Sequence, residues 1–171
     1  EGDTSLVQQK MAYSSAGVAR RLAVMNALNL QTGNTVLDVG CGAGHLIREI
    51  GLAVGHSGQA FGLDPSEAQI KAAKRHCEAL GNTQFLCCLA DQVDLLDASC
   101  DAIASIQTLD YIKDVGATLD QVVRLLKPTS SFVNVSVLWD HFKFHGADEK
   151  LNDLIHDAWK AHCHHQMLPL E

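Results

Sequence analysis

Apolar positions along the chain follow two patterns, short continuous runs and longer segments with apolar residues three or four positions apart. The short runs are typical of buried strands, and the longer segments are typical of amphipathic helices. Strands are predicted at residues 35–39, 59–63, 84–90, 101–106 and 131–138.

Helices are predicted in three of the four intervals between these strands and at both ends of the chain. They are expected at residues 14–30, at 45–54, from an N-cap at Ser66 to the Gly81-Asn82 turn, around 119–126, and at 151–159. The fourth of these ends at Lys127-Pro128. Alternating strands and helices predict an α/β fold, in which helices cover both faces of a doubly wound, Rossmann-like parallel sheet. Ligands of such sheets bind beyond the carboxyl ends of the strands.

Composition narrows the class of protein only a little. The chain has 171 residues, which suits a single domain, and a net charge of -7, which argues against a nucleic-acid partner. No apolar run approaches the ~18 residues of a membrane span, and the first ten residues lack the apolar core of a signal peptide, so a cytoplasmic location is expected. The six cysteines form no CxxC pair and are interpreted as free thiols.

Three glycines at alternate positions, Gly40, Gly42 and Gly44, separate the first strand from the following helix. Glycine permits a tight turn and a close approach of the backbone to a ligand. A dinucleotide site would require G-x-G-x-x-G, but His45 stands where the third glycine of that motif is expected. Asp38 also places a carboxylate where a pyrophosphate would be repelled, and it suits a ligand with an ammonium group.

The run Val-Leu-Asp-Val-Gly-Cys-Gly-Ala-Gly resembles motif I of the class I S-adenosylmethionine (SAM) dependent methyltransferases. Three later segments fall in register with the same family: Asp64 after the second strand, Asp91 after the third, and Leu-Leu-Lys-Pro before the fifth. Thr129-Ser130 replaces the family's usual glycine pair after that proline. The resemblance covers about residues 16 to 138. It implies the strand order 3-2-1-4-5 and a SAM-dependent methyltransferase acting on a small molecule.

The resemblance also assigns roles to residues beside the strand ends. Asp64 and Pro65 would lie at the ribose, Asp91 and Gln92 at the adenine, and Gln107 and Leu109 at the methionine part of SAM. The remaining cofactor-binding candidates belong to motif I and are Asp38, Gly40, Cys41, Gly42 and Gly44.

The acceptor side is less defined. Methyl transfer from SAM is an in-line displacement, and a general base is needed only if the acceptor must first lose a proton. Tyr111 after the fourth strand, and Asp140 and His141 after the fifth, are the candidate catalytic residues. Tyr13 is expected to cover the cofactor, because the N-terminal helix resembles the family's variable lid.

The C-terminal part departs from the family. Residues 1–30 are interpreted as a helical lid, 34–138 as the cofactor-binding core, and 139–171 as a helical segment of one single domain. The family's antiparallel hairpin of strands six and seven is expected to be missing, which predicts a bare sheet edge and a tendency to form a homodimer. The histidine-rich run at residues 162–165 is interpreted as a solvated helix end, and no metal is expected.

Two other functions remain open on the sequence. The chain could be a SAM-binding fragment without catalysis, because of the missing hairpin. An NAD(P)-dependent oxidoreductase is disfavoured by the glycine spacing and by Asp38.

Overall fold

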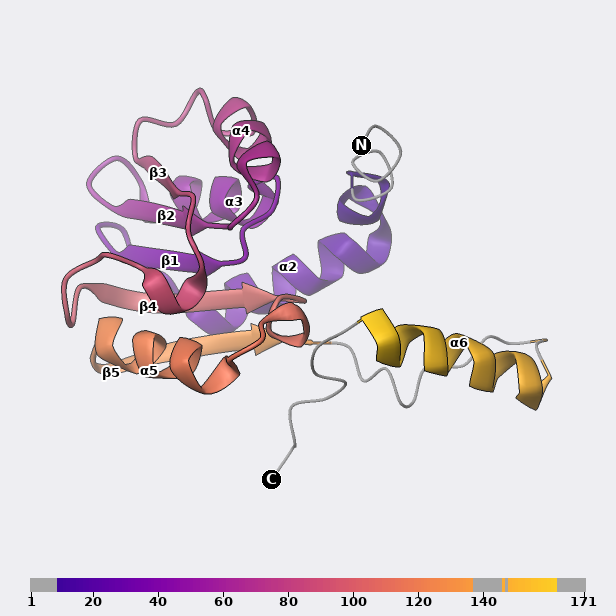
Figure 1. Ribbon diagram of the computed structural model, residues 1–171. Helices are drawn as coiled ribbons and strands as arrows, with labels where there is room; N and C mark the ends of the chain where they lie inside the picture. The colour runs from indigo at the N-terminus through magenta and orange to yellow at the C-terminus, as the bar shows by residue number, and fades with distance from the viewer. Residues whose placement is uncertain (1–8, 137–145, 147, 163–171) are drawn as a thin grey trace.

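One parallel sheet, ordered β3-β2-β1-β4-β5, forms the centre of the molecule (Figure 1). The computed structural model describes residues 9–136, 146 and 148–162. The strands are β1 (Thr35–Val39), β2 (Gln59–Leu63), β3 (Thr83–Leu86), β4 (Cys100–Ile106) and β5 (Leu126–Val135). The predicted fold class and strand order are therefore confirmed, and β1 and β2 have the predicted bounds.

The helices lie where the apolar periodicity places them: α3 has the predicted bounds, and the ends of the others are shifted. They are α2 (Ser15–Leu28), α3 (His45–Val54), α4 (Glu67–His76), α5 (Val115–Leu125) and α6 (Glu149–His162), with 3-10 turns η1 (Ala90–Gln92) and η2 (Leu109–Tyr111). Residues 9–13 are also helical and precede α2. Ser66 caps α4 as predicted, because its side chain accepts a hydrogen bond from the Gln69 N–H.

Each face of the sheet has its own core. α2, α3 and α4 cover one face, and their buried side chains include Val24, Ile47 and Ile70. On the other face, Val122 and Leu125 of α5 pack with Ile103 of β4 and its neighbours. The loop from Gly40 to Gly44 leaves β1 at the carboxyl edge between these two layers, so both cores fix its position.

The connection between β3 and β4 departs from a strict alternation of strands and α-helices. β3 ends at Leu86 rather than at residue 90, and only the single turn η1 precedes β4. Arg124 of α5 holds this connection, donating to the carbonyls of Val93 (3.1 Å) and Leu95 (2.7 Å) and pairing with Asp97 (2.6 Å). A network of this kind leaves no periodic trace in the sequence.

The start of β5 is also earlier than predicted. The strand begins at Leu126, directly after α5, and ends at Val135. Residues 137 and 138 of the predicted strand lie outside the described residues. Its register against β4 shifts, since Cys100 pairs with Leu126 but Ala102 pairs with Ser131. The intervening bulge holds Thr129 at a φ of 69°, a left-handed conformation. Thr129 thus adopts, with a side chain, the conformation that glycine adopts at lower cost.

In the sequence, the helical spacing of Val18, Leu22, Met25 and Leu28 predicts a single apolar stripe on α2, and the structure buries only part of it. Val18 and Leu22 are 47% and 58% exposed, whereas Val24 is fully buried and Leu28 nearly so. Apolar residues lie around most of this helix, and only its packing against β4 and β5 selects the face that is buried.

Candidate cofactor and active site

The loop from Gly40 to Gly44 is the centre of the site, as the sequence predicts. Its three glycines have φ values of 78°, 51° and 81°, all in the left-handed region. The N–H groups of Gly40 and Cys41 both donate to the carbonyl of Leu63, at 2.8 Å each. The loop is therefore fixed to the end of β2 before it enters α3.

Gly40 is the position with the least room. A Cβ on this residue would overlap Oγ1 and Cγ2 of Thr108 and lie 2.7 Å from the Thr108 Cβ. Gly42 has an equally restricted φ, but a Cβ there would have no heavy atom within 4 Å. The two glycines thus serve different purposes, since Gly40 permits a close approach to the β4 end and Gly42 leaves open space above the loop.

Asp64 at the end of β2 is tied to the glycine loop. Its Oδ2 accepts from the Gly42 N–H at 3.0 Å, and its Oδ1 accepts from the Ser66 N–H at 2.9 Å. A carboxylate oxygen accepts more than one hydrogen bond, so both oxygens keep capacity for hydroxyl donors. The two backbone bonds orient this carboxylate toward the loop side of the site.

Asp38 lies within the end of β1, where its side chain is 3% exposed. Burial, and secondarily the charge of Asp64, raises the pKa of Asp38 to about 7. Burying a carboxylate this deeply is unfavourable unless a cation or donors reach it. Asp38 lines a cavity, and a cationic ligand group in that cavity would relieve the cost.

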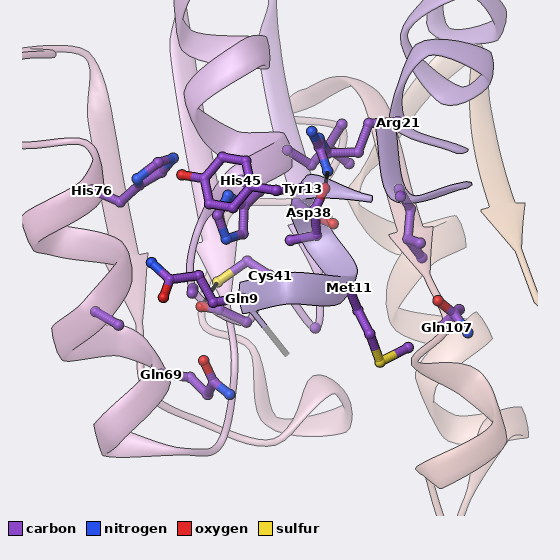
Figure 2. Close-up of a pocket in the computed structure, with 18 of the residues that line it drawn as sticks. Gln9, Met11, Tyr13, Arg21, Asp38, Cys41, His45, Gln69, His76 and Gln107 are labelled. Carbon is purple, nitrogen blue, oxygen red and sulfur yellow. Dashed lines mark hydrogen bonds between the residues drawn. The ribbon is translucent and has the colours of Figure 1, made fainter. Parts of the chain in front are cut away.

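The cavity has a volume of about 570 Å³ and lies between the glycine loop, the N-terminal segment and α4. In Figure 2 the side chains of Tyr13 and His45 overlap near the centre of the view, with His76 on one side and Gln107 on the other. Its walls come from four places in the sequence: residues 9–21, the glycine loop with Asp38, Gln69 to His76 of α4, and the β4 end at Ile106 and Gln107.

Sequence reasoning missed several residues of this cavity. Arg20 donates to the side-chain carbonyl of Gln107, which itself has a φ of 51°. Arg21 and His76 also line the cavity. The adjacent arginines on a helix without other basic residues were a usable clue, but the role of His76 depends on how α4 packs against α3.

The cofactor-binding candidates separate into three groups. Asp38, Gly40, Cys41, Gly42 and Gln107 line the cavity. Gly44 is buried at the start of α3, and Asp64 is joined to the loop by its hydrogen bond. Pro65, Asp91 and Gln92 are exposed residues outside the cavity, so they stay predictions for the ribose and adenine end. Leu109 is a core residue with 1% exposure and does not line the cavity, so its place at the methionine part of SAM also stays a prediction.

The acceptor candidates are not brought together at this cavity. Tyr111 ends η2, is 42% exposed and does not line the cavity. Asp140 and His141 lie outside the described residues, as does most of the histidine-rich run. The roles of these three residues at the acceptor therefore stay predictions.

No group of three or more His, Cys, Asp or Glu side chains gathers as a metal site needs among residues 9–136, 146 and 148–162. Over the same residues, no helix is long and apolar enough to cross a membrane.

Known proteins with similar sequences and structures support the assignment made from the glycine loop and the order of the sheet. A family model described as a methyltransferase domain matches residues 30–167. The ubiquinone biosynthesis O-methyltransferase of Nitrobacter winogradskyi is 36% identical over 103 residues, covering 60% of this chain and 38% of that protein. The chain spans less than half the length of this and three other curated relatives, between 38% and 48% of each.

Solved structures share the fold. A SAM-dependent methyltransferase from Aquifex aeolicus superposes with a TM-score of 0.67 at 22% identity, over 77% of this chain and 70% of that one. Geranyl diphosphate C-methyltransferase from Streptomyces coelicolor A3(2), solved with Mg²⁺, geranyl diphosphate and S-adenosyl-L-homocysteine, gives 0.70 at 18% identity, over 86% and 54%.

The chain belongs to the methyltransferase domain family, and its fold is that of the class I SAM-dependent methyltransferases. The resemblance stated from motif I is thereby confirmed. Family membership also decides against the oxidoreductase alternative.

Proposed function

We propose that this domain binds SAM at the glycine loop and transfers its methyl group to a small-molecule acceptor. The methionine part would lie in the cavity beside Asp38 and Gln107, and the ribose would lie against Asp64. The observation that carries this assignment is the buried Asp38 carboxylate facing the cavity. A cationic amino-acid group satisfies that carboxylate, whereas the pyrophosphate of a dinucleotide would be repelled by it.

The chain's residues would divide the binding of SAM between them. Asp38 attracts the ammonium group, and Asp64 accepts hydrogen bonds from the ribose hydroxyls. Arg20 lies at the Gln107 end of the cavity, where its positive charge would attract the carboxylate of the methionine part of SAM. When bound, SAM supplies a methyl group already activated by its sulfonium. The protein's contribution is then to hold the acceptor in line with that methyl and to exclude water.

Small-molecule acceptors are supported by the relatives. Two of the proteins that this chain resembles are named for ubiquinone biosynthesis and for geranyl diphosphate, both small molecules. Tyr111, Asp140 and His141 remain the candidates to contact the acceptor. A base among them would act only on an acceptor that must lose a proton.

Replacing Asp64 tests the cofactor assignment most directly. Asp64→Ala should weaken SAM binding by about 1.5–3 kcal/mol, the scale for losing hydrogen bonds to a charged group. Asp64→Asn keeps one acceptor oxygen and should cost less. Isothermal titration calorimetry with SAM, with S-adenosylhomocysteine and with NAD measures all three ligands on the same protein.

Asp120→Ala is the matched control, because it removes an exposed carboxylate from α5 on the other face of the sheet. It should leave the affinity unchanged. No binding of either SAM form to the unmodified chain would refute the proposed function. Binding without methyl transfer to any of a panel of acceptors would favour the alternative of a SAM-binding fragment without catalysis.

A further inference from the structure

The segment of residues 9–14 crosses the mouth of the cavity. Gln9, Met11, Ala12 and Tyr13 all contribute to the lining, and they come from a helical turn separate from α2. Figure 2 shows Tyr13 and Gln9 in front of His45 and Cys41. A ligand in the cavity would therefore be covered by this segment, which stands between the glycine loop and solvent.

Ser14 forms the joint between this segment and α2. Its hydroxyl donates to the Met11 carbonyl at 2.6 Å and accepts from the Gly17 N–H at 3.1 Å. At Gly17, a Cβ would overlap the Met11 carbonyl oxygen and lie 2.7 Å from that of Ala12. The folded-back position of residues 9–13 thus depends on glycine at position 17.

Little apolar burial holds the segment in place. Met11 and Tyr13 are 49% and 59% exposed. The Tyr13 ring meets the edge of His45 with centroids 5.1 Å apart, and His45 in turn lies 4.6 Å from His76. A segment with so few buried contacts has a low local stability, so individual polar bonds have a large share in keeping it closed.

The strongest such bonds come from Arg21. Its Nη1 donates to the Ala12 carbonyl at 2.7 Å, and its Nε pairs with Glu49 of α3 at 2.7 Å. The Arg21 side chain is only 12% exposed, so the guanidinium relies on these partners in place of water. Arg21 therefore connects three parts of the molecule: α2, α3 and the segment over the cavity.

The resemblance already predicts that the N-terminal segment is a lid over the cofactor. We propose that Arg21 is the positioning residue that holds residues 9–14, which form this lid, closed over the cavity by bridging Ala12 to Glu49. The inference rests on the proposed function for the identity of the ligand beneath the lid. Opening the lid requires the Ala12 bond to break, and the cofactor enters and leaves only when it is open.

Two measurements report on the lid. Lys10 is exposed and belongs to the segment, so the rate of cleavage after Lys10 by endoproteinase Lys-C, followed by mass spectrometry, measures its opening in the ligand-free protein. The dissociation rate of S-adenosylhomocysteine, from stopped-flow displacement, measures opening in the complex. A purely structural role for Arg21 would lower the unfolding midpoint without selectively changing either rate.

Arg21→Ala should raise both rates by about tenfold or more, the factor expected for losing a charged hydrogen bond. Arg21→Lys cannot reach both partners at once and should give an intermediate increase. Gly17→Ala should raise the same two rates without removing a charge. Lys74→Ala, which removes an exposed positive charge outside the cavity, is the matched control and should change neither.

Unchanged rates in folded Arg21→Ala and Gly17→Ala would overturn the lid and its bridge. Should Arg21→Ala fail to fold, Arg21→Lys and Gly17→Ala decide in its place. The two proposals fail separately. Absence of S-adenosylhomocysteine binding to the unmodified chain refutes the cofactor assignment, while Lys10 cleavage in the ligand-free variants still decides whether Arg21 closes the segment.

Discussion

The two faces of the sheet are covered in different ways. On the face of α2, α3 and α4, three helices pack around the glycine loop and leave the cavity at the carboxyl edge. On the opposite face α5 is the one α-helix within the described residues, and the β3–β4 connection beside it is irregular. Arg124 stabilises this connection by donating hydrogen bonds to two of its carbonyl groups, where elsewhere a packed helix would stabilise the chain.

The two faces therefore have different roles: the cavity face fixes the geometry of the site, and the α5 face stabilises the fold. The cavity face depends on a close approach of the backbone at Gly40, which leaves no room for an added methyl group. The α5 face depends on hydrogen bonds from an arginine, which stabilise the fold without contacting the site. Substitutions on the first face should therefore affect ligand binding, and substitutions on the second should affect the free energy of unfolding alone.

The largest effect is expected at Gly40. Gly40→Ala should destabilise the domain by about 2–5 kcal/mol, since it combines a left-handed φ with overlap on Thr108. It should also abolish measurable SAM binding, because either the loop or Thr108 must move. Urea denaturation and calorimetric titration measure the two effects.

Gly42→Ala is the control for this substitution. It has the same conformational penalty, about 1–2 kcal/mol, but its Cβ points into open space. If both variants lost equal stability, the contact with Thr108 would not be what limits residue 40.

A smaller effect, on the other face, is expected at Arg124. Arg124→Ala should lower the free energy of unfolding by about 2–3 kcal/mol, through the loss of its charged hydrogen bonds to Val93 and Leu95. Its bond to Asp97 should contribute little, because that carboxylate is largely exposed. Urea denaturation measures the loss, and the affinity for SAM should stay the same. A drop in affinity would show that the two faces are coupled.

The smallest effect is that of a one-unit change in pH, and it concerns Asp38 on the cavity face. Because the ionised form of Asp38 attracts an ammonium group, affinity for S-adenosylhomocysteine should rise with pH up to about 7, the pKa of this residue, and then level off. Below that value it should fall by at most about tenfold per pH unit. Titrations in a pH series, with Asp38→Asn as the non-ionising comparison, measure this slope.

The same residue should affect stability with the opposite sign. The folded state keeps the Asp38 proton between pH 3.8 and about 7, while the unfolded state releases it. The contribution of Asp38 to the free energy of unfolding should therefore fall as pH rises through this window, by at most about 1.4 kcal/mol per unit. Asp38→Asn should remove this part of the decline. An unchanged pH profile in that variant would show that Asp38 ionises normally.

The fold was predictable because its determinants are local. Apolar runs such as Thr35–Val39 and Gln59–Leu63 are buried on both faces and have only one stable interpretation. The glycines of the loop were recognisable for the same reason, since a tight turn between strand and helix requires residues that tolerate positive φ. The exposure of Val18 and Leu22 could not be predicted from the sequence, because α2 has apolar residues on several sides.

The sequence by itself determined the sheet, the glycine loop and the carboxylates of Asp38 and Asp64, each of which follows from residue type and spacing along a single element. Only the tertiary structure decided that Arg21 reaches Ala12 and Glu49, that Arg124 holds the β3–β4 connection, and that His76 faces His45. These contacts join residues on different elements. Their formation depends on how helices dock on the sheet, and no periodicity within one segment encodes that geometry.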